Sequence, residues 1–171
     1  MSDGRQAWGE ERSQTVTWND PMPALRIAAT LSGLDYLRGM RDGIYPPPPI
    51  SMLLGMDIVT VEEGFVTFAL TPHESHFNPI GVVHGGVLAT LLDSVTGCAV
   101  HSTLAAGWRY TSIDITVNYL RAVDLRTGPI LFTGRLVKGG RRVAFTTAEA
   151  TDSSGNVLAT ASSSLLVIAP D

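Results

Sequence analysis

The chain begins with a polar segment and then takes on a helical pattern. Residues 1–20 show no hydrophobic period, which predicts a mobile tail. The segment 20–23, Asp-Pro-Met-Pro, is typical of a helix start. From Leu25 to Met40 an apolar residue recurs at every third position, so we expect one helix that ends near Gly43.

A run of four prolines separates this helix from the rest of the chain. Residues 46–49 cannot continue a helix and predict a stiff extended linker, after which residues 50–54 fit one further helical turn. The pattern therefore divides the chain into an N-terminal part, 1–49, with tail, helix and linker, and a main domain, 50–171.

Further along, the apolar period changes to that of strands and then back to that of a helix. Segments 56–63 and 65–71 flank Gly64, which is a hairpin pattern. A loop over 71–83 is rich in Pro, His, Asn and Gly. From 84 to about 104 the period is helical, with small residues beside the apolar stripe, so we expect a long helix buried over most of its surface.

Four more strand segments follow the long helix. Two of them flank the glycine pair 139–140, which is typical of a two-residue hairpin turn. The expected strands cover residues 112–121, 130–138, 142–151 and 157–168. This order favours an α+β fold in which one antiparallel sheet packs on one buried helix, with an extra N-terminal helix.

The composition indicates a folded domain rather than a membrane protein. Of 171 residues 44% are hydrophobic and only 16% are charged, a balance that excludes a disordered chain. Between Ser75 and Trp108 only Asp93 carries a formal charge, but Asn, Pro, Gly and His residues interrupt every apolar window of about 20 residues that a membrane span needs. The charged N-terminus argues against a signal peptide, so we expect a cytoplasmic protein.

Charge and cysteine content narrow the partners further. The net charge of −4 does not favour nucleic acid. Residues 109–142 nevertheless carry an excess of basic side chains, which fits either a site for a small anionic ligand or a solvated set of strand and turn charges. Cys98 is the single cysteine, which excludes an internal disulfide, and its apolar neighbours predict a buried structural thiol.

The start of the long helix carries the first candidate chemistry. Gly85 and Gly86 leave the N–H groups of the first turn uncovered, at the positive end of the helix dipole. Such a site stabilises a carbonyl oxygen that becomes an oxyanion. Asp93 follows about two turns later among leucines, where a carboxylate is costly to bury unless it is paired or needed for function.

Each of these residues also has a purely structural interpretation. Gly85 and Gly86 would allow close packing of helix and sheet, and Asp93 would face solvent or bond a backbone group. His84 would cap the helix, and Asn78 would be a turn residue before proline. Their clustering in one short segment favours function over these alternatives.

The spacing of the candidate residues predicts an assembly. Gly85 and Asp93 are eight residues apart, so they lie about 12 Å apart along a helix and cannot both touch one reacting carbon. They meet only if a second copy of the helix lies antiparallel across a two-fold axis. We therefore expect a homodimer with two shared sites.

The segment 78–86 reads Asn-Pro-Ile-Gly-Val-Val-His-Gly-Gly, and together with Asp93 it resembles the motif of the hotdog-fold acyl-CoA thioesterases, the small phenylacetate-pathway type of the 4HBT superfamily. The resemblance extends from about residue 54 to 168 and includes the strand segment 114–121. It implies a hotdog fold, in which a curved antiparallel sheet wraps the long helix, and homodimers that pair into homotetramers. It also implies hydrolysis of an acyl-CoA substrate, with no cofactor, since coenzyme A is part of the substrate. The net charge of −4 and the interrupted apolar windows argue against nucleic acid and a membrane as partners.

The resemblance assigns roles at the helix. Asp93 would be the nucleophile or the general base, and the Gly85 amide would polarise the thioester carbonyl. Asn78 would orient the carbonyl or the attacking water, and His84 would shape the loop.

Further roles fall on the strands. A hydroxyl from the strand after the helix would assist the water, with Ser112 as the best match and Thr111 as the next. The candidate substrate-binding residues, the last three for the phosphates of coenzyme A, are Gly86, Lys138, Arg141 and Arg142. The four histidines lack the spacing of a metal site, so we expect no metal.

Two alternatives to a thioesterase remain open at this point. One is a hotdog hydratase or dehydratase, and the other is a non-catalytic hotdog domain that binds acyl-CoA. Aryl, short-chain and medium-chain acyl groups are all compatible with the sequence.

Overall fold

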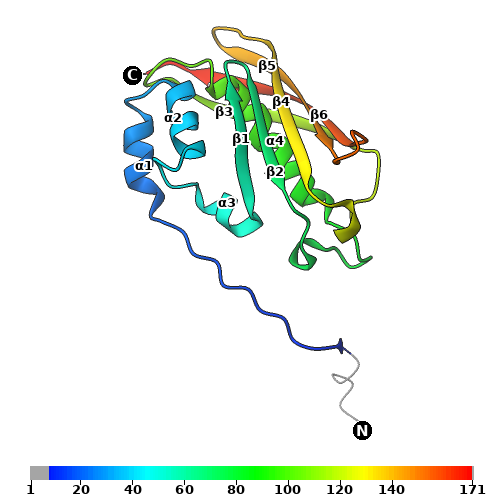
Figure 1. The fold of residues 1–171 in the computed structure, drawn as a ribbon. Coiled ribbons are helices and arrows are strands. Elements are labelled where there is room, and N and C mark those ends of the chain that lie inside the picture. The colour runs from blue at the N-terminus through cyan, green and yellow to red at the C-terminus, as the bar shows by residue number, and fades with distance from the viewer. Residues whose placement is uncertain (1–7, 171) are drawn as a thin grey trace.

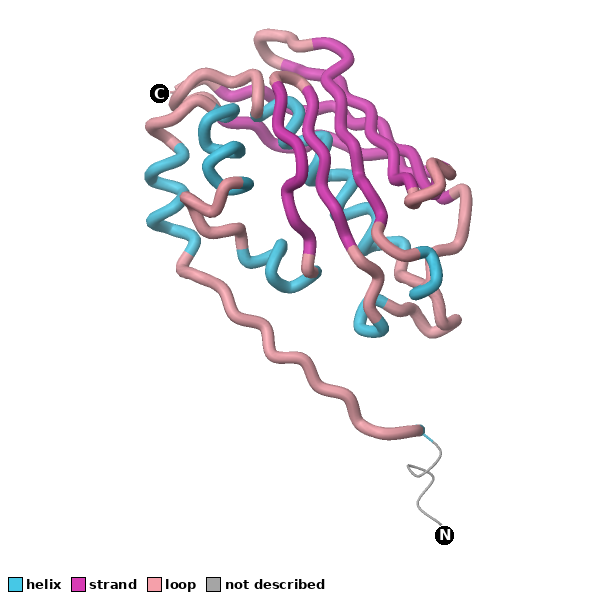
Figure 2. Tube along the Cα trace, in the orientation of Figure 1, coloured by secondary structure: helices cyan, strands magenta, loops and turns pink. Residues whose placement is uncertain are grey.

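A computed structural model, which describes residues 8–170, shows six antiparallel strands curved around one long helix, α4 (Figures 1 and 2). The strand order is β1-β2-β4-β5-β6-β3. The elements are α1 (Pro21–Ala28), α2 (Gly33–Arg41), α3 (Pro49–Leu54), β1 (Met56–Glu62), β2 (Phe65–Leu70), η2 (Glu74–His76), α4 (Gly85–His101), β3 (Arg109–Tyr119), η3 (Leu125–Thr127), β4 (Ile130–Lys138), β5 (Val143–Thr151) and β6 (Val157–Ile168). The predicted α+β architecture, the hairpin around Gly64 and the buried helix are confirmed. The predicted two-residue turn at 139–140 is wrong, because β4 and β5 are joined by the four residues 139–142.

The prediction of one helix from 21 to about 43 is wrong in one respect, because the structure has two helices there. Ser32 is extended, and its hydroxyl accepts the Asp35 amide at 3.1 Å, so a new helix starts after it. The two halves of the apolar stripe therefore face different ways: Leu25 is 58% exposed, whereas Leu37 is 1% exposed. Of the predicted tail, residues 9–20 contain neither helix nor strand and run away from the body (Figure 1), and residues 1–7 lie outside the described residues.

Helix α4 packs directly on the sheet. Its residues Leu91, Leu92, Val95 and Ala99 have no exposed surface. Strand β4 approaches so closely at Gly134 that a Cβ atom there would lie 2.2 Å from the carbonyl oxygen of Val95. Glycine is therefore required at this crossing, where no free space separates helix from sheet.

We expect Gly134→Ala to lower the free energy of unfolding by about 2–3 kcal/mol, because the new methyl group would meet backbone atoms on α4 that cannot rotate away. Urea unfolding at a fixed protein concentration measures the change. Gly139→Ala is the matched control at the end of the same strand, where a Cβ would have only ordinary contact at 3.5 Å, and it should change stability by less than about 0.5 kcal/mol. Equal stability of the two variants would contradict the packing described for β4.

Strand β3 forms one edge of the sheet and pairs with β6. It starts three residues earlier than expected, since Arg109 already pairs with Ile168. The register shifts between Ser112 and Asp114, so Ile113 is an extra residue and is 56% exposed. This bulge decides which β3 side chains face α4.

Within residues 8–170, no helix combines the length and the apolar character that spanning a membrane requires.

Candidate functional site

The start of α4 is organised by His84. The ring Nδ1 accepts the Gly86 amide at 2.8 Å, which confirms the interpretation of His84 as the helix cap. The backbone amide of His84 itself donates to the carbonyl of His76 at 2.8 Å, so the loop is tied to the helix start. Since Nδ1 acts as an acceptor here, any hydrogen bond that the ring donates comes from Nε2.

Gly85 and Gly86 differ in what their amides do. The Gly86 amide is taken by His84, whereas the part of the chain that the structure describes offers no acceptor to the Gly85 amide. Gly85 is the first residue of α4, where an amide has no partner within the helix. Of the two glycines, Gly85 therefore has the amide that is available to a ligand.

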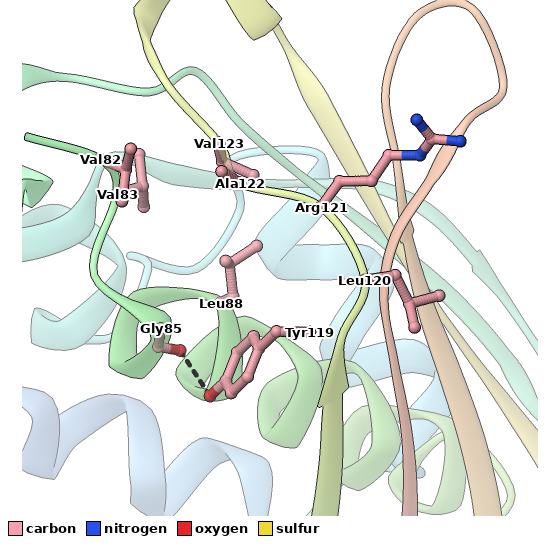
Figure 3. Close-up of a pocket in the computed structure, with 9 residues that line it drawn as sticks. All are labelled: Val82, Val83, Gly85, Leu88, Tyr119, Leu120, Arg121, Ala122 and Val123. Atoms are coloured by element: carbon pink, nitrogen blue, oxygen red, sulfur yellow. Dashed lines mark hydrogen bonds between the residues drawn. The ribbon is translucent and has the colours of Figure 1, made fainter.

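The carbonyl of Gly85 is also held. The hydroxyl of Tyr119, at the end of β3, donates to it at 2.9 Å, as the dashed line in Figure 3 shows. A Cβ atom at Gly85 would lie 3.0 Å from the Tyr119 ring, so a side chain is disfavoured at this position. Close approach of helix and strand is thus one reason for Gly85, as the structural interpretation of the glycines proposed.

A pocket of about 330 Å³ opens beside Gly85 (Figure 3). Its lining is mostly apolar, and the side chain of Arg121 at its edge extends away from Gly85. The lining residues are Val82, Val83, Gly85, Leu88, Tyr119, Leu120, Arg121, Ala122 and Val123. An unpaired amide next to an apolar pocket suits a carbonyl compound with an apolar substituent.

Asn78 builds the loop that leads to this pocket. Its side-chain oxygen accepts the amides of Ile80 at 3.0 Å and Val82 at 3.3 Å, so Asn78 is a turn residue, as the structural alternative predicted. These bonds use only the oxygen. The side-chain nitrogen has no acceptor among residues 8–170, and Asn78 as a whole is half-buried.

Asp93 is partnered by a strand hydroxyl. The Oγ of Ser112 donates to the Asp93 carboxylate at 2.8 Å, which ties the middle of α4 to β3. Ser112 pairs with the buried Leu165, whereas Thr111 pairs with Leu166, so Thr111 lies on the opposite face of the sheet from Asp93. The structure thus brings Ser112, and not Thr111, to the carboxylate.

Two groups of predicted site residues lie apart in one chain. Gly85 and Asp93 are separated by about 12 Å along α4. The exposed Lys138, Arg141 and Arg142 lie at the β4–β5 hairpin, beside the C-terminal end of α4, which is about 25 Å from Gly85.

Sequence reasoning did not select two residues that the structure places at the pocket. Tyr119 and Arg121 both line it, and both belong to the segment 114–121 that carried part of the resemblance. Their position at the end of the strand that follows the long helix was the feature of the sequence that could have pointed to them.

Other titratable groups fit structural roles. Burial raises the pKa of the Cys98 thiol to about 12, so no thiolate forms there near neutral pH, in agreement with the predicted structural thiol. Burial lowers the pKa of His76 and of His101, which keeps both rings neutral near pH 7. Among the described residues no cluster of His, Cys, Asp or Glu is arranged to hold a metal ion.

Comparison of the sequence with known families and curated proteins gives consistent matches. Residues 80–159 match the family model described as the thioesterase superfamily. The human protein named acyl-coenzyme A thioesterase 13 is 32% identical over 95 residues, which are 56% of this chain and 66% of that protein. A putative esterase from Caenorhabditis elegans is 30% identical over 126 residues, which are 73% of this chain and 66% of that protein.

Solved structures show the same fold. A putative thioesterase related to phenylacetic acid degradation, from Ralstonia eutropha, superimposes with a TM-score of 0.70 and 28% identity, over 77% of this chain and 98% of that chain. A Streptococcus mutans protein solved with acetyl-CoA gives a TM-score of 0.62 and 28% identity, over 67% of this chain and 90% of that chain. The PaaI protein of Escherichia coli gives a TM-score of 0.70 and 21% identity, over 82% of this chain and 98% of that chain. At this identity the likeness shows the fold alone. The expected hotdog fold is confirmed.

Proposed function

Because the chain belongs to the thioesterase superfamily, we propose that it hydrolyses acyl-CoA thioesters to the free acid and coenzyme A. The observation that carries this proposal is the Gly85 amide, unpaired in one chain and lying next to an apolar pocket at the positive end of α4. In the reaction, water oxygen adds to the thioester carbon, the C–S bond breaks, and the sulfur leaves as coenzyme A thiol. The acid product releases one proton at neutral pH.

The site residues divide the chemical work. The Gly85 N–H donates to the carbonyl oxygen and stabilises the charge that develops on it during addition. The free side-chain nitrogen of Asn78 supplies a second donor to the carbonyl or to the water. Asp93 takes the proton of the attacking water or attacks the carbonyl itself, and the hydroxyl of Ser112 fixes its carboxylate.

The site is completed by a second copy of the chain. The distance of about 12 Å between Gly85 and Asp93 supports a homodimer in which each site combines Gly85 of one copy with Asp93 of the other. The edge strand β3 has 11 residues, of which eight are exposed and three are partly buried, and a long exposed edge is the kind that a partner covers.

An antiparallel arrangement also suits the basic hairpin. Lys138, Arg141 and Arg142 lie beside the C-terminal end of α4. When two α4 helices lie antiparallel with Gly85 opposite Asp93, this end of one copy lies about 12 Å beyond Gly85 of the other. The hairpin can then contact the phosphates of coenzyme A from across the dimer, with Arg121 of the first copy at the pocket edge.

The proposal is tested with a panel of thioesters, namely acetyl-CoA, octanoyl-CoA, benzoyl-CoA and phenylacetyl-CoA, and thiol release is followed with a chromogenic reagent. We expect kcat/KM of at least about 10⁴ M⁻¹s⁻¹ for one member of the panel. The same compounds are titrated by calorimetry. Binding without turnover across the panel would instead favour a non-catalytic acyl-CoA-binding protein, and neither binding nor turnover would contradict both functions.

A further inference from the structure

Tyr119 lies where β3 ends against the first turn of α4. It is 52% exposed, and its ring forms one wall of the pocket beside Gly85 (Figure 3). Its hydroxyl donates to the Gly85 carbonyl at 2.9 Å. Because the ring is largely exposed, packing of the core does not depend on this side chain. Its hydrogen bond to Gly85 is therefore the contact that we consider further.

The bond from Tyr119 fixes one end of a single peptide unit whose other end is also fixed. The Gly85 carbonyl and the Gly86 N–H belong to the same planar group. Tyr119 binds the carbonyl at 2.9 Å, and the His84 Nδ1 accepts the N–H at 2.8 Å. The plane that follows Gly85 is therefore held from two sides, by a strand residue and by the helix cap.

Holding this plane restrains the free amide of Gly85. Glycine has the widest range of backbone torsions, and two glycines stand in sequence here. The Gly85 N–H shares its own peptide plane with the His84 carbonyl, which accepts the Val87 amide at 2.9 Å. With the following plane also fixed, rotation about the Gly85 backbone is limited on both sides, so the N–H keeps one direction. A donor that is already oriented stabilises developing charge without the cost of reorganisation.

We propose that Tyr119 is a positioning residue that orients the Gly85 amide toward the thioester oxygen. This inference rests on the proposed function, since Tyr119 would act in the same site through Gly85 and not on the substrate directly. It predicts that the Tyr119 hydroxyl acts on the transition state, in which the oxygen is charged, and much less on binding of the uncharged thioester.

The test is Tyr119→Phe, which keeps the ring wall and removes only the hydroxyl. We expect kcat to fall about fivefold to tenfold, as suits the loss of one hydrogen bond, with KM within about twofold of wild type. Tyr45→Phe removes a hydroxyl from a ring that stacks on Tyr36, away from the pocket, and should leave both constants unchanged. An unchanged kcat in Tyr119→Phe, or a change confined to KM, would overturn the proposal.

A double-mutant cycle shows whether Tyr119 acts through Gly85. In the Gly85→Ala background a Cβ atom already crowds the tyrosine ring at 3.0 Å, so Tyr119→Phe should change kcat by less than about twofold. The full fivefold to tenfold effect in that background would show that Tyr119 works independently of Gly85.

A measurement without substrate separates this proposal from the proposed function. Amide hydrogen exchange of Gly85 and Gly86 is followed by NMR. Exchange of the Gly86 amide should be at least about threefold faster in Tyr119→Phe, because the peptide plane loses its bond from β3 and keeps only the restraints of the helix and its cap. If wild type hydrolyses no thioester and exchange still rises, only the function fails. Unchanged exchange overturns the positioning role whatever the activity.

Discussion

Asp93→Asn is expected to lower kcat for acyl-CoA hydrolysis by about a thousandfold. The amide has the shape of the carboxylate and can still accept the Ser112 hydroxyl, now bonded at 2.8 Å, so the fold is retained while the base or nucleophile is lost. General-base catalysis by a positioned side chain contributes about 10²–10⁴-fold, and this range sets the expected loss. Steady-state thiol release and a thermal melt of the same preparation measure activity and folding together.

Asp57→Asn is the matched control for this change. Asp57 is an exposed carboxylate on β1, away from α4, and its replacement should keep kcat within about twofold. Near-full turnover by Asp93→Asn, with a normal melting curve, would remove Asp93 from the mechanism.

Mixing Asp93→Asn with Gly85→Pro is expected to restore about a quarter of the wild-type activity from two inactive proteins. In a random mixture half of the dimers are hybrids, and each hybrid has one intact site, with Gly85 from one copy and Asp93 from the other. Proline removes the Gly85 N–H at the first helical position, where it is tolerated, and the extended backbone of His84 suits the residue before a proline. The new ring meets the exposed Tyr119 side chain, which has room to shift.

The control for complementation is a mixture of Asp93→Asn with the double variant Asp93→Asn/Gly85→Pro. Hybrids of this pair lack Asp93 in every site and should stay inactive. Subunit exchange is verified with tags of different mass. Confirmed exchange without recovery of activity in the first mixture would show that the two residues do not meet across a dimer interface.

The main elements could be predicted from the sequence because their patterns are strong. The buried stripe of α4 and the strands on either side of the glycine pair 139–140 follow simple periods, and the structure has them within a few residues of the predicted bounds. The His84 cap was also foreseeable, since it depends on contacts between neighbours in the chain. The break at Ser32 was missed, because a step of three continues across it and hides a local cap.

The choice between Ser112 and Thr111 shows why the site was harder to predict from the sequence than the main elements. Strict alternation along β3 would place Thr111 on the same face as Ile113 and Ile115, toward the helix. The extra residue in the bulge reverses this order, so that Ser112 turns to Asp93. A bulge depends on the pairing with β6, which no periodicity in one segment reports. The bond from Tyr119 to Gly85 joins residues 34 positions apart and was hidden for the same reason.

The contact between β4 and α4 at Gly134 has a consequence for how the substrate range of such a protein changes over evolution. Since helix and sheet touch there, an acyl chain cannot pass between α4 and β4 at Gly134, and the space open to it beside Gly85 is bounded by α4, the loop before it and the end of β3. Two side chains that line this space, Tyr119 and Leu120, are exposed in the monomer. Selection can exchange them at little cost in folding stability, so chain-length preference and thermal stability are expected to vary independently among relatives.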